Sequence, residues 1–160
     1  MRILLTNLVL THRTGTETVI RDLAIELAAR SHHIEVFSPA PGELAAELSA
    51  AGIRVLDDPG LLSEPEIIHG QHHVPTMLAL LRFPGVPAVY YCHDRTFFHD
   101  EPPRHPRILK YLAVDDHVLQ RCGAVTGDAK HVQVILNSVP LHRFPPRPPL
   151  PERCSRRADL

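Results

Sequence analysis

The chain has 160 residues, of which 44% are apolar, and it carries 17 basic and 18 acidic side chains. This length allows one domain with a real core, and the near balance of charge gives no reason to expect a nucleic-acid partner. The opening MRILLTN is neither a secretion signal nor a membrane span, because polar and acidic residues soon follow it. Three widely spaced cysteines form no CxxC pair, which favours a reducing compartment. We therefore expect one cytoplasmic domain with no transmembrane segment.

The first stretch of the chain predicts a buried strand, a glycine turn and a helix. Residues 2–10 are almost continuously apolar, and apolar side chains recur at three- and four-residue spacing over residues 19–28. Thr14 and Glu17 have the spacing of a capping box at the helix start. The free N–H groups there, with the positive end of the helix dipole, are a natural seat for a phosphate. Gly15 has no Cβ and would let such a ligand approach closely.

Strands and helices alternate along the rest of the chain. The patterns predict strands at 33–38, 53–56, 65–70, 86–92, 111–114 and 132–136, and helices at 43–51, 74–82 and 115–121. This order indicates a doubly wound, mostly parallel α/β sheet of the Rossmann-like kind, with the strand that begins at Arg2 near its centre. Residues 95–106 are rich in histidine, proline and aromatic residues, and their length suits a functional loop.

Ligands of such sheets bind beyond the carboxyl ends of the strands. The residues at those ends are 11–16, 69–73 and 93–100, and they carry several of the twelve histidines. We therefore expect one open cleft at this edge of the sheet. Its predicted lining is His12, Gly15, His69, His72 and His93.

Five segments in order resemble the N-terminal domain of GT-B glycosyltransferases of family 4. They are MRILLTN with THRTGTE, EIIHGQHH, VYYCHD, YLAVDDHVLQR and VQVILNSVPLHRF, and together they cover nearly all of residues 1–145. The resemblance implies that Gly15, Thr16 and Glu17 lie by the phosphates of a nucleotide-sugar donor. Thr14 stands where the family usually has the first glycine of a pair.

The resemblance also implies the remaining site residues. His93 matches a histidine in the cleft near the transferred sugar, and with Asp94 it forms the predicted catalytic pair. The domain would mainly form the acceptor pocket, here lined by His12, His69, His72 and His73. Nucleotide-sugar and an unknown acceptor are the implied partners, and no cofactor or metal is expected beside the donor.

The resemblance sets the expected domain organisation. Residues 1–144 correspond to the N-terminal domain, with Asn137-Ser138 and Phe144 near its end, and the proline- and arginine-rich residues 145–160 read as the start of an interdomain linker. The second domain, which in the family binds most of the donor, has no counterpart here. A separate C-terminal half or a homo-oligomer could supply it. These 160 residues alone are expected to show no glycosyl transfer.

Two alternatives remain open. The chain could be an acceptor-binding module or truncated remnant without catalysis, or a metal-dependent hydrolase built on its histidines together with Asp94. Imidazole and carboxylate groups are ligands of zinc. However, His72 and His73 are adjacent and would diverge on a helix, and HExxH is absent.

Overall fold

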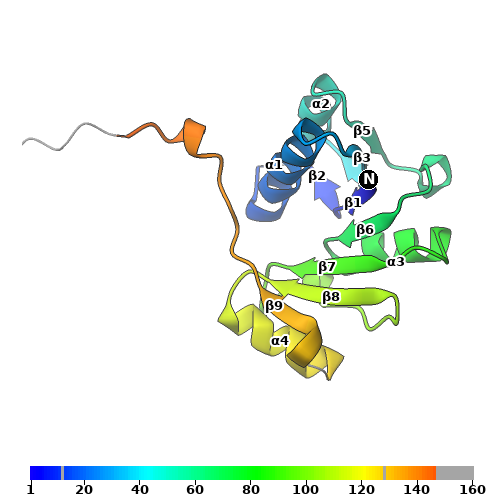
Figure 1. Cartoon of the computed structure of the whole chain (residues 1–160), viewed down its shortest axis with the longest axis vertical. Helices are drawn as coiled ribbons and strands as arrows, with labels where there is room; N and C mark the ends of the chain where they lie inside the picture. Colours follow the sequence, from blue (N-terminus) through cyan, green and yellow to red (C-terminus); the bar gives the residue numbers. More distant parts are fainter. Residues whose placement is uncertain (12, 128, 147–160) are drawn as a thin grey trace, which may run out of the picture.

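Seven parallel strands form the main sheet of the computed structural model, which describes residues 1–11, 13–127 and 129–146 (Figure 1). Their spatial order is β5-β3-β1-β6-β7-β8-β9, and each neighbouring pair runs parallel. The strands are β1 (Arg2–Thr6), β3 (His33–Phe37), β5 (Arg54–Leu56), β6 (Ile67–Gly70), β7 (Ala88–Cys92), β8 (Ile108–Ala113) and β9 (Val132–Val134). The predicted parallel sheet, with the first strand in its interior, is confirmed.

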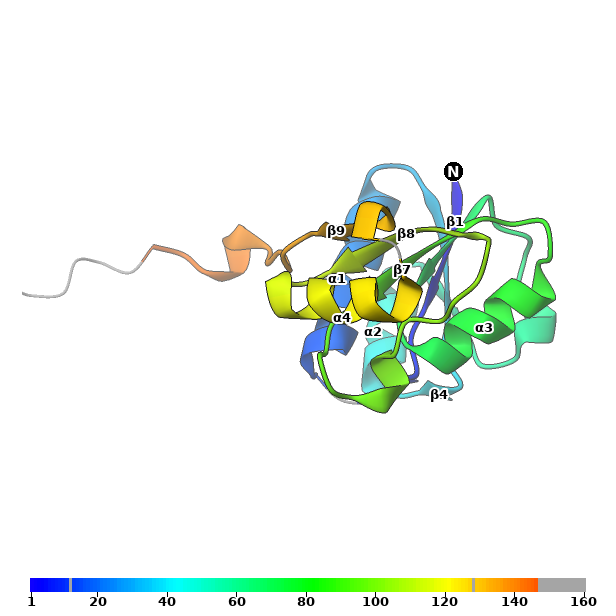
Figure 2. The same ribbon diagram turned by 90° about the horizontal axis from the view of Figure 1, so that it is seen from below.

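Helices lie on both faces of this sheet, two on each (Figures 1 and 2). On one face α1 (Gly15–Ala29) and α2 (Glu43–Ala50) pack over the half formed by β1, β3 and β5. On the other face α3 (His73–Arg82) and α4 (Asp116–Thr126) pack over β6, β7, β8 and β9. Strand order therefore reverses between β1 and β6, where a doubly wound sheet places its ligand site.

The predicted first strand is shorter than its apolar run. Leu4 and Leu5 are both buried, one in each of the two helix-covered cores, which explains why the pattern does not alternate. After Thr6 the chain leaves the sheet, and β2 (Val9–Leu10) pairs with β4 (Ala40–Pro41) in a separate two-stranded sheet. The break lies at the buried Asn7, whose Nδ2 donates a 2.8 Å hydrogen bond to the carbonyl oxygen of Val9.

The start of α1 has the predicted capping box. Glu17 Oε2 accepts hydrogen bonds from the backbone N–H of Thr14, at 2.9 Å, and from its hydroxyl, at 2.8 Å. Gly15, the first residue of the helix, has no positive φ, and a Cβ built on it would meet nothing within 4 Å. The fold therefore does not require a glycine at this position.

The helix predicted over residues 115–121 is longer in the structure. Asp115 is its N-cap and accepts a 2.8 Å hydrogen bond from Val118 N–H, so the predicted start is correct. The helix continues through Gly123 to Thr126, and Gly127, with a φ of 72°, is its C-cap. No helix among the described residues has the length and apolar character needed to cross a membrane. Almost all of the predicted tail, residues 147–160, lies outside the described part of the chain.

Candidate functional site

A cavity of about 310 Å³ opens at the carboxyl ends of the central strands. Its walls come from the start of α1, the start of α3, the loop after β7 and the segment after β9. The lining residues are Thr14, Gly15, Thr16, His72, His93, Asp94, Phe97, Asp100 and Asn137. We call this space the strand-end cavity. It contains five of the predicted site residues, namely Gly15, Thr16, His72, His93 and Asp94.

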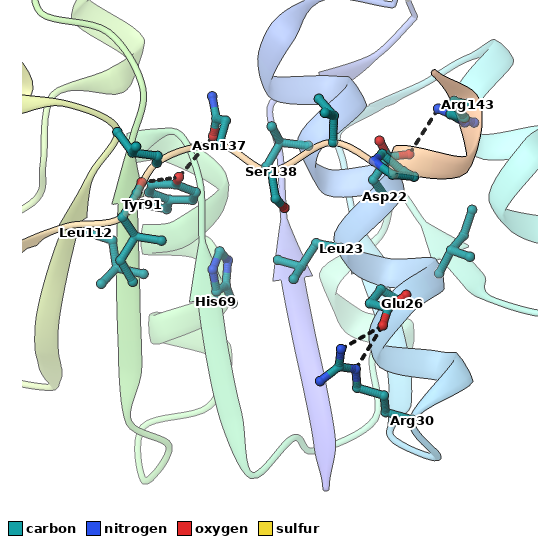
Figure 3. A pocket seen from close by; sticks show the side chains of 16 residues that line it. Asp22, Leu23, Glu26, Arg30, His69, Tyr91, Leu112, Asn137, Ser138 and Arg143 are labelled. Carbon is teal, nitrogen blue, oxygen red and sulfur yellow. Dashed lines mark hydrogen bonds and ion pairs between the residues drawn. The ribbon is translucent and has the colours of Figure 1, made fainter. Parts of the chain in front are cut away.

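The remaining predicted site residues lie elsewhere. His69 lines a different cavity, of about 570 Å³, on the α1 side of the sheet (Figure 3). His69 lies within β6 and faces the same side as Tyr91, while the following Gly70 faces Thr76 of α3. His93, by contrast, follows the end of β7 and belongs to the loop at the carboxyl edge of the sheet. The prediction of one cleft shared by His69 and His93 is therefore corrected. His12 lies outside the described residues.

His73 and Glu17 support the walls of the strand-end cavity and do not line it. The Nδ1 atom of His73 lies 3.0 Å from the carbonyl oxygen of Glu101, which ties α3 to the loop after β7. The carboxylate of Glu17 is fully buried and is used by the capping box with Thr14. In this structure neither side chain is placed to contact a ligand in the cavity.

His72 has an unusual backbone at the start of α3. Its φ of 61° is rare for a residue with a side chain, and such strain persists only where neighbouring contacts enforce it. Leu8 N–H donates a 3.2 Å hydrogen bond to His72 Nδ1, and the Thr76 hydroxyl donates a 2.8 Å bond to the His72 carbonyl oxygen. Burial lowers the pKa of His72 to about 4, so the ring is neutral at neutral pH.

His93 follows β7 and has no hydrogen-bond partner at either ring nitrogen among the described residues. Its ring packs against that of Tyr91, with the centroids 4.2 Å apart and the ring planes tilted by 50°. Burial lowers the pKa of His93 to about 3, and the nearby His72 and His69 contribute to the shift. A neutral imidazole offers one donor and one acceptor, which suits a hydroxyl group better than a phosphate anion.

Asp94 is occupied by its own turn. Its Oδ1 accepts hydrogen bonds from the backbone N–H groups of Thr96 and Phe97, at 2.5 and 2.6 Å. These bonds stabilise the carboxylate and hold the pKa of Asp94 below its usual range. The carbonyl oxygen of Asp94 also accepts a 2.7 Å bond from Arg121 of α4. Its geometry is that of a loop-organising residue, and its predicted catalytic role stays a prediction.

Sequence reasoning did not single out Asp100, which the structure places in the cavity wall. Its side chain is 1% exposed, and its Oδ2 accepts hydrogen bonds from the backbone N–H groups of both His93 and Asp94. Burial raises the pKa of Asp100 to about 6. A carboxylate in an irregular loop carries no periodic signal, so the pattern of the sequence offered no means of finding this contact.

Buried polar atoms without partners gather at this end of the sheet. Among the described residues they include Asn7 Oδ1 after β1, both side-chain amide atoms of Gln71 after β6, and the two ring nitrogens of His93 after β7. The three strands are neighbours in the sheet. Because such atoms are rare in folded proteins, a group of them calls for an explanation such as a bound ligand or ordered water.

The charge of the strand-end cavity is not that of a complete phosphate site. Its described lining contains the carboxylates of Asp94 and Asp100 and no lysine or arginine. The positive element is the N-terminus of α1, where the backbone of Gly15 and Thr16 lines the space. The described residues contain no group of three or more His, Cys, Asp or Glu side chains arranged to hold a metal ion.

Several solved structures have a backbone similar to that of this chain. HepE from Anabaena, solved in complex with UDP-glucose, superimposes with a TM-score of 0.72 at 18% identity over 89% of this chain and 45% of that one. A glycosyltransferase from Rickettsia africae gives 0.65 at 17% identity, over 90% and 45%. A UDP-N-acetylglucosamine 2-epimerase gives 0.50 at 12% identity, over 84% and 47%. The chain thus spans about 45% of the length of the first two.

At these identities the likeness establishes the fold. None of the curated proteins compared with the sequence matches it. The model of the family described as Glycosyltransferase Family 4, however, matches residues 13–143, which include the whole of α1 and every strand-end loop from β3 to β9. The chain therefore belongs to glycosyltransferase family 4.

Proposed function

We propose that the chain is the acceptor-side domain of a GT-B enzyme that transfers a sugar from a nucleotide-sugar donor to an acceptor. Its family and its fold support this proposal, as does the UDP-glucose bound to its structural neighbour HepE. The observation that carries it is the strand-end cavity, whose lining includes both the start of α1 and His93, a neutral ring whose buried nitrogens have no hydrogen-bond partner among the described residues. One side suits a phosphate and the other a sugar hydroxyl.

In sugar transfer, the residues on the two sides of the cavity would have different roles. The leaving nucleoside diphosphate gains negative charge as the sugar bond breaks, and preorganised N–H donors at Gly15 and Thr16 would stabilise that charge. His93 would hold a hydroxyl of the transferred sugar through one ring nitrogen. His72 lines the same space and, being neutral, would face the incoming acceptor.

The cavity supplies only part of what a donor needs. Its described lining offers no cation for the diphosphate and no wall for the base or ribose. Binding energy must orient the sugar before it can lower a barrier, and an open site leaves water to weaken each electrostatic contact. We therefore expect these 160 residues alone to bind UDP-glucose with about millimolar affinity and to catalyse no transfer. A second half or a second copy of the chain would complete the site.

A cytoplasmic location fits the state of the cysteines. Cys92 and Cys122 are both buried and unbridged, and an oxidising compartment would favour their pairing or modification.

The alternative of acceptor binding without catalysis is favoured by the lack of a lysine or arginine in the described lining of the strand-end cavity. It predicts that sugars resembling an acceptor bind at His72 while UDP-glucose does not bind.

The test is to titrate the ¹⁵N-labelled chain with UDP-glucose and to assay UDP release in parallel. The proposal predicts saturable shifts of the Gly15, Thr16 and His93 amides without UDP release. Shifts confined to the larger cavity near His69 would contradict the placement of the donor. Turnover by the isolated chain that is lost in His93→Ala would contradict the need for a second half.

A further inference from the structure

The loop after β7 is closed by a buried carboxylate that no sequence motif identified. Asp100 ends the short 3₁₀ turn Phe98–Asp100, and its side chain is 1% exposed. The carboxylate reaches back to the beginning of the same loop, where His93 leaves the strand. Residues 93–100 therefore form a loop whose two ends are joined by the Asp100 side chain.

The hydrogen bonds of this carboxylate are made with the last residue of β7 and the first two residues of the loop. Oδ2 accepts from the backbone N–H groups of His93 and Asp94, and the Cys92 thiol lies 3.5 Å from the same oxygen. The Cys92 thiol also lies 3.2 Å from the Asp100 carbonyl oxygen. Oδ1 is buried and has no hydrogen-bond partner among the described residues. Hydrogen bonds from N–H groups to an ionised carboxylate are stronger than those between neutral groups.

The middle of the loop is also fixed by hydrogen bonds, so the Asp100 carboxylate acts on a rigid loop. Asp94 caps the turn through Thr96 and Phe97. Arg121 of α4 donates to the carbonyl oxygens of Asp94, at 2.7 Å, and Phe97, at 3.1 Å. With the far side of the loop fixed in this way, the bonds from Asp100 determine where the His93 backbone lies.

The position of the His93 ring depends on these backbone bonds because, among the described residues, the ring itself makes no hydrogen bond. Both ring nitrogens are buried and have no partner in the described part of the chain, and the ring packs in a tilted arrangement against Tyr91, with the centroids 4.2 Å apart. We propose that Asp100 is a positioning residue, whose ionised carboxylate holds the backbone of His93 and Asp94 and thereby keeps the His93 imidazole at the wall of the strand-end cavity. What the imidazole then contacts rests on the function proposed above.

This arrangement makes the loop sensitive to pH. Burial raises the pKa of Asp100 to about 6. The ionisable groups that face it are Tyr90 and Cys92 from β7, His93 and Asp94 from the loop, Arg121 and Cys122 from α4, and His73 beside Glu101 at the start of α3. We call the two bonds from the His93 and Asp94 N–H groups to the Asp100 carboxylate the clamp. Below the pKa of Asp100 the neutral acid is a weaker acceptor for these N–H groups, so the clamp weakens as the pH falls.

A titration of the unmodified chain tests the clamp without any ligand. We expect the amide protons of His93 and Asp94 to lie downfield at neutral pH and to move upfield together, with a midpoint near the Asp100 pKa of about 6. The ring protons of His93, shifted by the Tyr91 ring, should follow the same midpoint. Absence of this step at both amides would overturn the proposal, whether or not any variant folds.

The variant Asp100→Asn tests the assignment, because it keeps the shape of the side chain and removes its charge. The step should disappear in D100N and stay in Asp57→Asn, which removes an exposed carboxylate after β5. UDP-glucose should bind about tenfold more weakly to D100N than to D57N, which is about 1.4 kcal/mol. The proposal would be overturned if the His93 and Asp94 amides showed the same pH-dependent step in both variants and both variants bound UDP-glucose equally. If the amide step is present but UDP-glucose does not bind even the unmodified chain, the clamp stands and the proposed function fails.

Discussion

The hydroxyl of Tyr91 lies 2.9 Å from Asn137 Oδ1 and 2.7 Å from the carbonyl oxygen of Ile135, so a residue of β7 holds the segment that follows β9 (Figure 3). Asn137 lines both the strand-end cavity and the larger cavity beside α1. The Tyr91 ring lies between His69, at 6.0 Å, and His93, at 4.2 Å. Tyr91 thus lines the larger cavity and, through its hydrogen bond, holds Asn137, which lines both cavities.

Replacing Tyr91 by Phe should free this segment. The ring and its packing remain, while the shared hydroxyl proton is lost, so we expect the free energy of unfolding to fall by about 1 kcal/mol. The Asn137 amide should exchange with solvent faster. Urea unfolding and amide hydrogen exchange measure the two effects.

Tyr111→Phe is the matched control. Its hydroxyl also donates one 2.7 Å bond to a carbonyl oxygen, that of Pro103. It should cost a similar free energy without changing exchange at Asn137. Equal exchange at Asn137 in both variants would show that Tyr91 does not hold the segment.

Removing the buried capping carboxylate of Glu17 should lower the free energy of unfolding more than removing an exposed carboxylate. Glu17→Ala leaves the N–H and the hydroxyl of Thr14 without their acceptor, and we expect a loss of about 1–2 kcal/mol in urea unfolding. Glu17→Gln keeps an acceptor oxygen and should lose less. Glu43→Ala, at the exposed first position of α2, should cost at most about 0.5 kcal/mol. Similar losses for E17A and E43A would argue against the capping box.

Stability should fall as the solution is acidified. Burial lowers the pKa values of His69 and His72 to about 4 and of His93 to about 3, whereas an unfolded histidine titrates near about 6.5. The unfolded chain therefore binds more protons below about pH 6.5, and the stability contributed by neutral rings is lost as the pH falls. Asp100 opposes this change, because its raised pKa lets the folded state take up a proton between about pH 6 and 4.

Three histidines outweigh one carboxyl group, so the free energy of unfolding should decrease from about pH 6.5 to about pH 4.5. Urea unfolding at several pH values gives the slope, and each histidine contributes up to about 1.4 kcal/mol per pH unit. His69→Asn should reduce that slope, since it removes one titrating ring. A stability that rises on acidification would contradict the burial of these rings.

The sequence predicted the elements whose signal is periodic or local. The apolar runs and the capping box placed β1, α1 and the parallel order of the sheet, and the rule that ligands bind at strand ends placed Gly15, His72 and His93 at one edge. The break after Thr6 was missed, because it depends on side-chain bonds of Asn7 within an otherwise apolar run. The helix predicted over residues 115–121 was too short, because Gly123, which disfavours a helix, lies inside α4.

The candidate site was harder to predict than the fold. Strand ends could be assigned to one edge, but the exact last residue of each strand could not. His69 lies within β6 and lines the larger cavity, whereas His93 follows the end of β7 and lines the strand-end cavity. Asp100 acts through a contact with backbone seven residues earlier in an irregular loop. No residue type or spacing in the sequence marks such a contact.

The proposed function requires a nucleotide-sugar to place its phosphates at the start of α1. Gly15 permits a clean test, since an added methyl group would meet nothing within 4 Å and the fold does not require glycine there. Gly123 in α4 also has open space around it, and alanine at either position should leave stability unchanged or raise it by up to about 1 kcal/mol.

The decisive measurement is therefore the affinity of UDP-glucose for Gly15→Ala and for Gly123→Ala, each compared with the unmodified chain by NMR titration. The account predicts about tenfold weaker binding for G15A, because its methyl group lies where a phosphate must approach, and unchanged binding for G123A. Equal affinities in all three proteins would place the phosphates elsewhere and contradict the account.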